Sequence, residues 1–125
     1  PLEARKFSLV TKNRRLVVNV FKLKLDIMSK FGELIDVDIP VLLDFFTDWN
    51  EESAEMHAVL RDVAAALGDK AKVIKIDVDK NKDLADALRI KALPTFIIYK
   101  SGEMKWRQSG EQDANTLIGL IQEYA

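Results

Sequence analysis

Apolar residues recur at intervals that change repeatedly along residues 28–125, and each change predicts a new element. The run 40–46 is apolar except for Asp44, which is typical of a strand buried on both faces. Residues 72–78 predict a second strand. Residues 95–99 and 103–108, joined by Ser101-Gly102, predict a β-hairpin.

Helical spacing separates these strands. A long helix is expected to begin near Asn50 and to end at Gly68, with apolar positions every three or four residues (Met56, Val59, Leu60, Val63 and Leu67). Ser29 is expected to cap a short helix, residues 84–88 mark another, and Asp113 or Asn115 opens a last amphipathic helix. This order predicts an α/β fold, a single domain with a central sheet and helices on both faces.

Residues 21–27 alternate apolar and charged side chains, which is typical of a half-buried strand. Met28-Ser29-Lys30 is typical of a natural protein start, so we predict an N-terminal extension over 1–27 and a core domain over 28–125. The extension holds seven basic and two acidic residues, a net charge of +5, and leaves −6 for residues 28–125. It lacks a signal peptide's cleavage site, and is either an appended segment without a role or a basic docking arm.

The composition is globular, since 48% of the 125 residues are hydrophobic and 31% are charged. The net charge of −1 gives no general reason to expect nucleic-acid binding, and no apolar run approaches the ~18 residues of a membrane-spanning helix. The absence of cysteine excludes disulfides, thiolate metal ligands and thiol catalysis by this chain. His57 alone cannot form a zinc site, and the calcium-like start at Asp77 has Lys82 where glycine is needed. We therefore expect no metal and no cofactor.

Residues 28–125 resemble the thioredoxin family. The resemblance lies in the strand 40–46 followed by Trp49 and a long helix, then in residues 72–79, 90–95 and 100–103 and in Gly110, in family order and spacing. It implies the thioredoxin fold, a mixed sheet flanked by helices, with a cis peptide bond between Leu93 and Pro94.

The active-site motif departs from the family pattern. Where thioredoxins carry Trp-Cys-Gly-Pro-Cys, this chain has Trp49-Asn50-Glu51-Glu52-Ser53. In the family, a thiolate attacks a disulfide and a second thiol resolves the mixed intermediate. Neither a carboxamide nor a serine hydroxyl can replace them, so we expect no dithiol–disulfide oxidoreductase activity from this chain.

Two interpretations of the replaced motif stay open. Asn50 is a preferred N-cap, and Glu51 and Glu52 suit the first turn of a helix, so the motif can be a stable helix start and no more. Alternatively, Asp48, Glu51 and Glu52 form an acidic lip that selects a basic partner.

The resemblance also assigns roles to Asp44 and Lys75. In the family an acid at the first position is buried behind the cysteines and shuttles a proton, with the second residue nearby. A buried acid normally has a raised pKa. Without thiols, we expect the two residues to persist as a buried relic pair or a hydrogen-bonded pair.

The family's peptide-binding groove corresponds to Trp49, Leu93, Pro94, Thr95 and Gly110. A cis-proline loop leaves backbone groups free for an extended peptide, and Trp49 adds apolar area, so binding needs no thiol. The turns alone equally explain Pro94 and Gly110.

Three functions follow. The first, which we expect, is a redox-inactive thioredoxin-like module in the cytoplasm that holds a peptide or protein in the groove, with no nucleic-acid or membrane partner. The second is an oxidoreductase-related protein whose chemistry comes from another chain or has been replaced, for example through Ser53 and His57, four residues apart on one helix. The third is a structural domain whose basic arm mediates assembly, for example by adding a strand to a sheet edge. The sequence does not indicate the oligomeric state.

Overall fold

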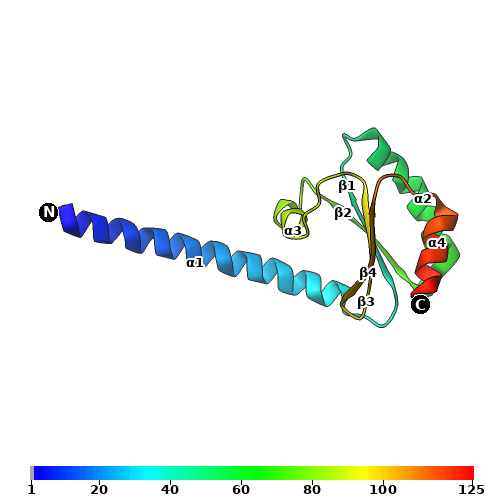
Figure 1. The fold of residues 1–125 in the computed structure, drawn as a ribbon, viewed down its shortest axis with the longest axis horizontal. Helices are drawn as coiled ribbons and strands as arrows, with labels where there is room; N and C mark the ends of the chain where they lie inside the picture. Colours follow the sequence, from blue (N-terminus) through cyan, green and yellow to red (C-terminus); the bar gives the residue numbers. More distant parts are fainter. Residues whose placement is uncertain (1) are drawn as a thin grey trace.

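A four-stranded mixed sheet forms the centre of the molecule (Figure 1). The computed structural model describes residues 2–125, and it describes side chains from Val18 onward except that of Phe21. The strands are β1 (Val41–Phe46), β2 (Lys72–Asp77), β3 (Thr95–Lys100) and β4 (Glu103–Ser109), in the order β2-β1-β3-β4. β1 runs parallel to β2 and antiparallel to β3, which pairs antiparallel with β4. The four strands predicted from the sequence are confirmed, with ends shifted by one residue.

Helices cover both faces of this sheet, as predicted. α2 (Glu51–Leu67), which a 3₁₀ turn at Gly68–Lys70 follows, and α4 (Ala114–Glu123) pack against one face. The last turns of α1 (Leu2–Ile35) and α3 (Lys82–Ala87) lie against the other (Figure 1). Successive side chains of β1 alternate between the two cores, because side chains of a strand point to opposite faces in turn.

Side-chain caps set the beginnings of α2 and α4. The Oδ1 atom of Asn50 accepts a hydrogen bond from the backbone N–H of Ser53 at 2.9 Å. Asp113, and not Asn115, caps α4, because its carboxylate accepts the N–H of Thr116 at 2.7 Å. Gly68 ends α2 with φ of 55°, a left-handed value that glycine adopts without a steric penalty.

The predictions for the N-terminal region are wrong in two respects. Residues 21–27 are not a strand, and no separate helix begins at Ser29, because both stretches belong to the single 34-residue helix α1. Leucine and lysine, which alternate at 22–25, are strong helix formers. The predicted boundary between residues 27 and 28 therefore falls inside a helix, which extends away from the body (Figure 1). None of the described helices combines the length and apolarity needed to cross a membrane.

Among the described side chains of α1, those of its C-terminal turns take part in the core. Phe31 and Ile35 are each 6% exposed, and the ring of Phe31 meets that of Tyr99 edge to face with centroids 5.6 Å apart. The hairpin turn also holds the end of the helix, since the N–H of Gly102 donates to the carbonyl of Ile35 at 3.1 Å. By contrast, Leu23 and Leu25 are each 55% exposed.

Alanine substitutions in the packed and in the extended part of α1 are expected to have different effects on stability. Phe31→Ala should lower the free energy of unfolding by about 3 kcal/mol, because it removes a buried aromatic ring and leaves a cavity. Leu25→Ala should change it by less than about 0.5 kcal/mol. Urea unfolding followed by tryptophan fluorescence measures both. Equal losses would show that the distal part of α1 belongs to the same cooperative unit.

Candidate functional site

The candidate site lies at the edge of the sheet where β1 ends and β3 begins. Phe45 pairs with Thr95, so the loop after β1 and the loop before β3 are neighbours. The Leu93–Pro94 peptide bond in the second loop is cis. The N–H of Gly110 donates to the carbonyl of Pro94 at 2.8 Å, which brings the loop after β4 to the same place. The sheet thus gathers the three segments that carry the predicted groove residues.

Trp49 is exposed but held in place. Its side chain is 76% exposed, and its indole Nε1 donates to Oδ2 of Asp79 at 2.8 Å. Thr47 Oγ1 donates to the same oxygen at 2.7 Å. These two hydrogen bonds, that of Thr47 first, lower the pKa of Asp79. We did not predict Asp79 as a site residue; its position just beyond β2, the strand parallel to β1, is the signal that could have identified it.

Of the other predicted groove residues, Leu93 offers backbone groups without a described hydrogen bond, whereas the side chains of Pro94 and Thr95 are buried. Pro94 and Thr95 are buried, and Thr95 Oγ1 lies 2.6 Å from the carbonyl oxygen of Ala92 and 2.9 Å from Ser109 Oγ. The side chain of Thr95 therefore serves the loop and is not open to a ligand. Among the described residues, no hydrogen bond occupies the backbone N–H or C=O of Leu93.

The replaced motif forms a helix start with a buried serine. Ser53 is fully buried, and its Oγ accepts the N–H of Thr47 at 2.9 Å. His57 Nε2 lies 3.4 Å from Asp48 Oδ1, and Lys75 Nζ lies 3.4 Å from His57 Nδ1. No described hydrogen bond joins Ser53 to His57. Among the described hydrogen bonds, none joins the Ser53 hydroxyl to a basic side chain.

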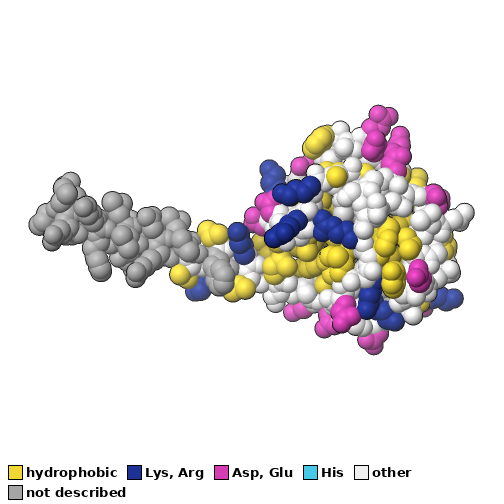
Figure 2. Space-filling model, viewed as in Figure 1, with side chains coloured by type: hydrophobic (Ala, Val, Ile, Leu, Met, Phe, Trp, Pro, Cys, Tyr) yellow, Lys and Arg dark blue, Asp and Glu magenta, His cyan; other side chains and the backbone are white. Residues whose placement is uncertain are grey.

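Acidic side chains surround this edge of the molecule. Asp48, Glu51 and Glu52 are exposed, and acidic groups project where α2 begins (Figure 2). Desolvation, and then the carboxylates of Glu55 and Glu52, raise the pKa of Glu111, which the sequence analysis had not singled out. Within residues whose side chains are described, no three acidic or histidine groups are placed to hold a metal ion.

Asp44 lies buried in the sheet without a hydrogen bond. It is 0% exposed, and neither carboxylate oxygen has a partner among the described residues. Lys75 is its register neighbour on β2 but is exposed, with Nζ next to His57. The expected hydrogen-bonded pair therefore does not form, and Lys75 is not buried. Burial raises the pKa of Asp44 to about 7, although the positive charge of Lys75 lowers it in part.

The stability of the protein should consequently fall as the pH rises from about 4 to about 7. In this range the unfolded chain has lost the Asp44 proton, whose ordinary pKa is 3.8, while the folded chain retains it. The shift corresponds to about 4 kcal/mol, present below pH 4 and lost by about pH 7. Asp44→Asn should unfold at a higher urea concentration than the parent chain at pH 8 and at a similar one at pH 4. An equal difference at both pH values would contradict a titrating Asp44.

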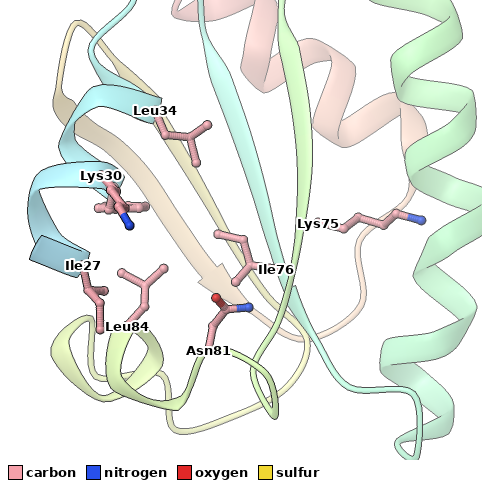
Figure 3. Close-up of a pocket in the computed structure, with 8 residues that line it drawn as sticks. Ile27, Lys30, Leu34, Lys75, Ile76, Asn81 and Leu84 are labelled. Atoms are coloured by element: carbon pink, nitrogen blue, oxygen red, sulfur yellow. The ribbon is translucent and has the colours of Figure 1, made fainter. Parts of the chain in front are cut away.

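A separate cavity lies on the face of the sheet that α1 and α3 cover. It has a volume of about 410 Å³ and is lined mainly by α1, β2 and α3 through Ile27, Phe31, Leu34, Ile76 and Leu84 (Figure 3). The side chain of Lys75 points away from these residues, toward α2 (Figure 3). The cavity is thus distinct from the predicted groove.

Residues 22–123 match the family model "Thioredoxin". The chain belongs to the thioredoxin family. The thioredoxin fold predicted from the sequence is confirmed by this match and by solved thioredoxin structures. One of these, a mutant thioredoxin from Halobacterium salinarum, superposes with a TM-score of 0.64 at 35% identity, over 73% of this chain and 78% of that one.

Curated thioredoxins are similar over most of the body. A rice protein, "Thioredoxin Y, chloroplastic" (Oryza sativa subsp. japonica), is 42% identical over 95 residues, which are 75% of this chain and 56% of that protein. A thioredoxin from Rickettsia felis is 30% identical over 71% of this chain and 85% of its own length. The chain thus spans little more than half of the rice protein. Within this thioredoxin-family chain, Asn50 and Ser53 stand where the family motif has its cysteines.

Proposed function

We propose that this chain is a redox-inactive member of the thioredoxin family that binds an extended segment of peptide or protein beside the Leu93–Pro94 loop. The observation that carries the proposal is the pairing of two features. The backbone N–H and C=O of Leu93 are unoccupied among the described hydrogen bonds, and the exposed ring of Trp49 lies at the same edge of the sheet. A main-chain donor and acceptor beside an apolar surface suit an extended ligand.

The fixed position of Trp49 favours binding. Its hydrogen bond to Asp79 restricts the indole before a ligand arrives, so less side-chain entropy is lost on association. Because the carbonyl of Pro94 is already paired with Gly110, a ligand strand would pair with Leu93 and not with the next residue. The surrounding carboxylates of Glu52, Glu55 and Glu111 favour a ligand that carries lysine or arginine.

Redox inactivity is inferred from the chemistry of the residues in the motif. Asn50 is engaged as the α2 cap and has no nucleophilic atom for sulfur. Ser53 is buried, and no described hydrogen bond joins its hydroxyl to a base. The alternative in which Ser53 and His57 supply replacement chemistry therefore lacks the hydrogen bond it requires. The cytoplasmic location stays a prediction, since the rice relative is named a chloroplastic protein.

The groove can be tested with peptides selected from a random linear library on the immobilised chain. The enriched peptide should bind the parent chain, and Trp49→Ala should weaken binding by roughly tenfold, because an exposed aromatic anchor is lost. Met104→Ala is the matched control, since Met104 is also exposed (46%). It lies near the beginning of β4, beside the hairpin turn, whereas the end of β4 leads to Gly110 at the proposed site. Fluorescence anisotropy measures both dissociation constants. No enrichment, or equal losses in the two variants, would refute the groove.

Redox inactivity is tested by the reduction of insulin disulfides with dithiothreitol. The parent chain should give only the rate seen without protein, because it has no thiol. Asn50→Cys combined with Ser53→Cys restores the family's spacing of cysteines and should raise the rate, which shows that the assay can detect activity on this scaffold. Acceleration by the parent chain would overturn the proposal.

A further inference from the structure

The loop between α3 and β3, residues 88–94, carries the backbone groups on which the proposed site depends. The end of this loop is fixed by two contacts. The N–H of Gly110 donates to the carbonyl of Pro94 at 2.8 Å, and the hydroxyl of Thr95 lies 2.6 Å from the carbonyl oxygen of Ala92. A main-chain donor and acceptor add a ligand strand at the lowest entropic cost where the whole loop is held in one conformation. What holds the beginning of the loop therefore matters equally for the site.

Arg107, on β4, holds the beginning of the loop. Its Nη1 atom donates to the carbonyl of Leu88 at 2.6 Å, and its Nη2 atom donates to the carbonyl of Arg89 at 2.8 Å. Carbonyl groups at the end of a helix have no partner within that helix, and α3 ends just before Leu88. The planar guanidinium directs its N–H groups in a fixed geometry, so the two bonds hold consecutive carbonyls at once.

Arg89 depends on such support because its backbone is left-handed, with φ of 55°. Residues other than glycine adopt such values rarely, and keep them only where the surrounding structure holds them. The N–H of Arg89 donates to the carbonyl of Asp86 at 3.0 Å, and the next N–H, that of Ile90, donates to the carbonyl of Ala85 at 2.9 Å. These two bonds close the end of α3, whereas the bond from Arg107 ties the left-handed residue to the sheet.

We propose that Arg107 is a positioning residue of the groove, which fixes the loop and thereby the backbone groups of Leu93 before a ligand binds. This inference rests on the proposed function. Arg107 acts through the loop and not on the ligand, because its described hydrogen bonds go to Leu88 and Arg89, at the other end of the loop from Leu93.

The hairpin thus attaches the loop at two points. Arg107 lies opposite Ile97 in the hairpin and binds the beginning of the loop, and Gly110, which follows β4, binds Pro94 at its end. Loss of the first attachment should loosen residues 89–93, while the strands of the sheet stay paired.

The test compares the association and dissociation rates of the selected peptide on the parent chain and on Arg107→Met, followed by stopped-flow fluorescence anisotropy. Methionine keeps much of the apolar part of the side chain but donates no hydrogen bond. If the loop then adopts the binding conformation about a tenth of the time, the dissociation constant rises about tenfold. The rise should come from slower association with an unchanged dissociation rate, because the bound loop keeps all its contacts with the peptide.

Control variants separate positioning from charge and from stability. Lys105→Met removes the same charge from the same strand, and the ammonium of Lys105 bonds to Glu103 and not to the loop. Phe31→Ala lowers stability through the packing of α1, away from the groove. Both should leave the dissociation constant within about twofold of the parent. Arg107→Lys should recover binding only in part, because a flexible ammonium does not reproduce the fixed fork of the guanidinium.

Hydrogen exchange of the chain without peptide gives a second readout. The N–H groups of Arg89 and Ile90 should exchange more than about tenfold faster in Arg107→Met, because their bonds lie at the loosened end of α3, whereas those of β1 should change far less. Circular dichroism checks that the variants are folded, and Arg107→Lys carries the same comparison if Arg107→Met is unfolded. Unchanged exchange at the two N–H groups would overturn the proposal.

The binding outcomes also distinguish this inference from the proposed function. Equal binding by the parent chain and Arg107→Met would overturn the positioning role and leave the groove intact. A faster dissociation rate in Arg107→Met would overturn it too, because Arg107 would then contact the ligand itself. Absence of peptide binding by the parent chain would refute the groove, and with it a positioning role for Arg107.

Discussion

The pairing of β1 on both of its edges is the constraint on which the rest of the structure depends. β2 and β3 take up its backbone hydrogen bonds, and helices cover both of its faces, so residues 41–45 are completely buried. A strand without a free edge or a free face has one position in the fold. The position of β1 therefore also sets the position of the residues that follow it. Among these, Thr47 and Trp49 donate hydrogen bonds to Asp79.

The burial of β1 also encloses the carboxyl group of Asp44. Its carboxyl group lies in the middle of β1, without a hydrogen-bond partner among the described residues, where burial opposes ionisation. In a redox-active relative such a group would have a proton-transfer role beside the thiols. Here the motif that follows β1 is a capped helix start, and the raised pKa of Asp44 affects stability instead.

The site and α1 differ in how much apolar surface they expose and in how firmly the rest of the fold holds it. At the site, a buried framework presents backbone groups of Leu93 without a described hydrogen bond and one exposed indole, that of Trp49. α1 has the reverse arrangement, because Val18, Val20, Leu23 and Leu25 are about half exposed on the part of the helix that extends from the body.

Local pattern was sufficient for the body. The apolar run at 40–46, the spacing from Met56 to Leu67 and the caps Asn50 and Asp113 determined strands and helices correctly, since each is governed by neighbours in sequence. The sequence landmarks also indicated which loops meet at one edge of the sheet, but not the burial of the Thr95 side chain, because its partners Ala92 and Ser109 are set by loop and strand pairing.

The remaining points did not follow from the local pattern of apolar and charged residues. The alternation at 21–27 fits a strand, but no edge of the sheet receives it, and good helix formers then extend α1 through it. Adjacent register positions bring Asp44 and Lys75 close, yet the long lysine side chain reaches His57 and solvent, which costs less than burying its charge. Outside residues 21–29, sequence thus determined which elements form; competition for hydrogen bonds and for solvent, visible only once the elements are packed, decided which side chains meet.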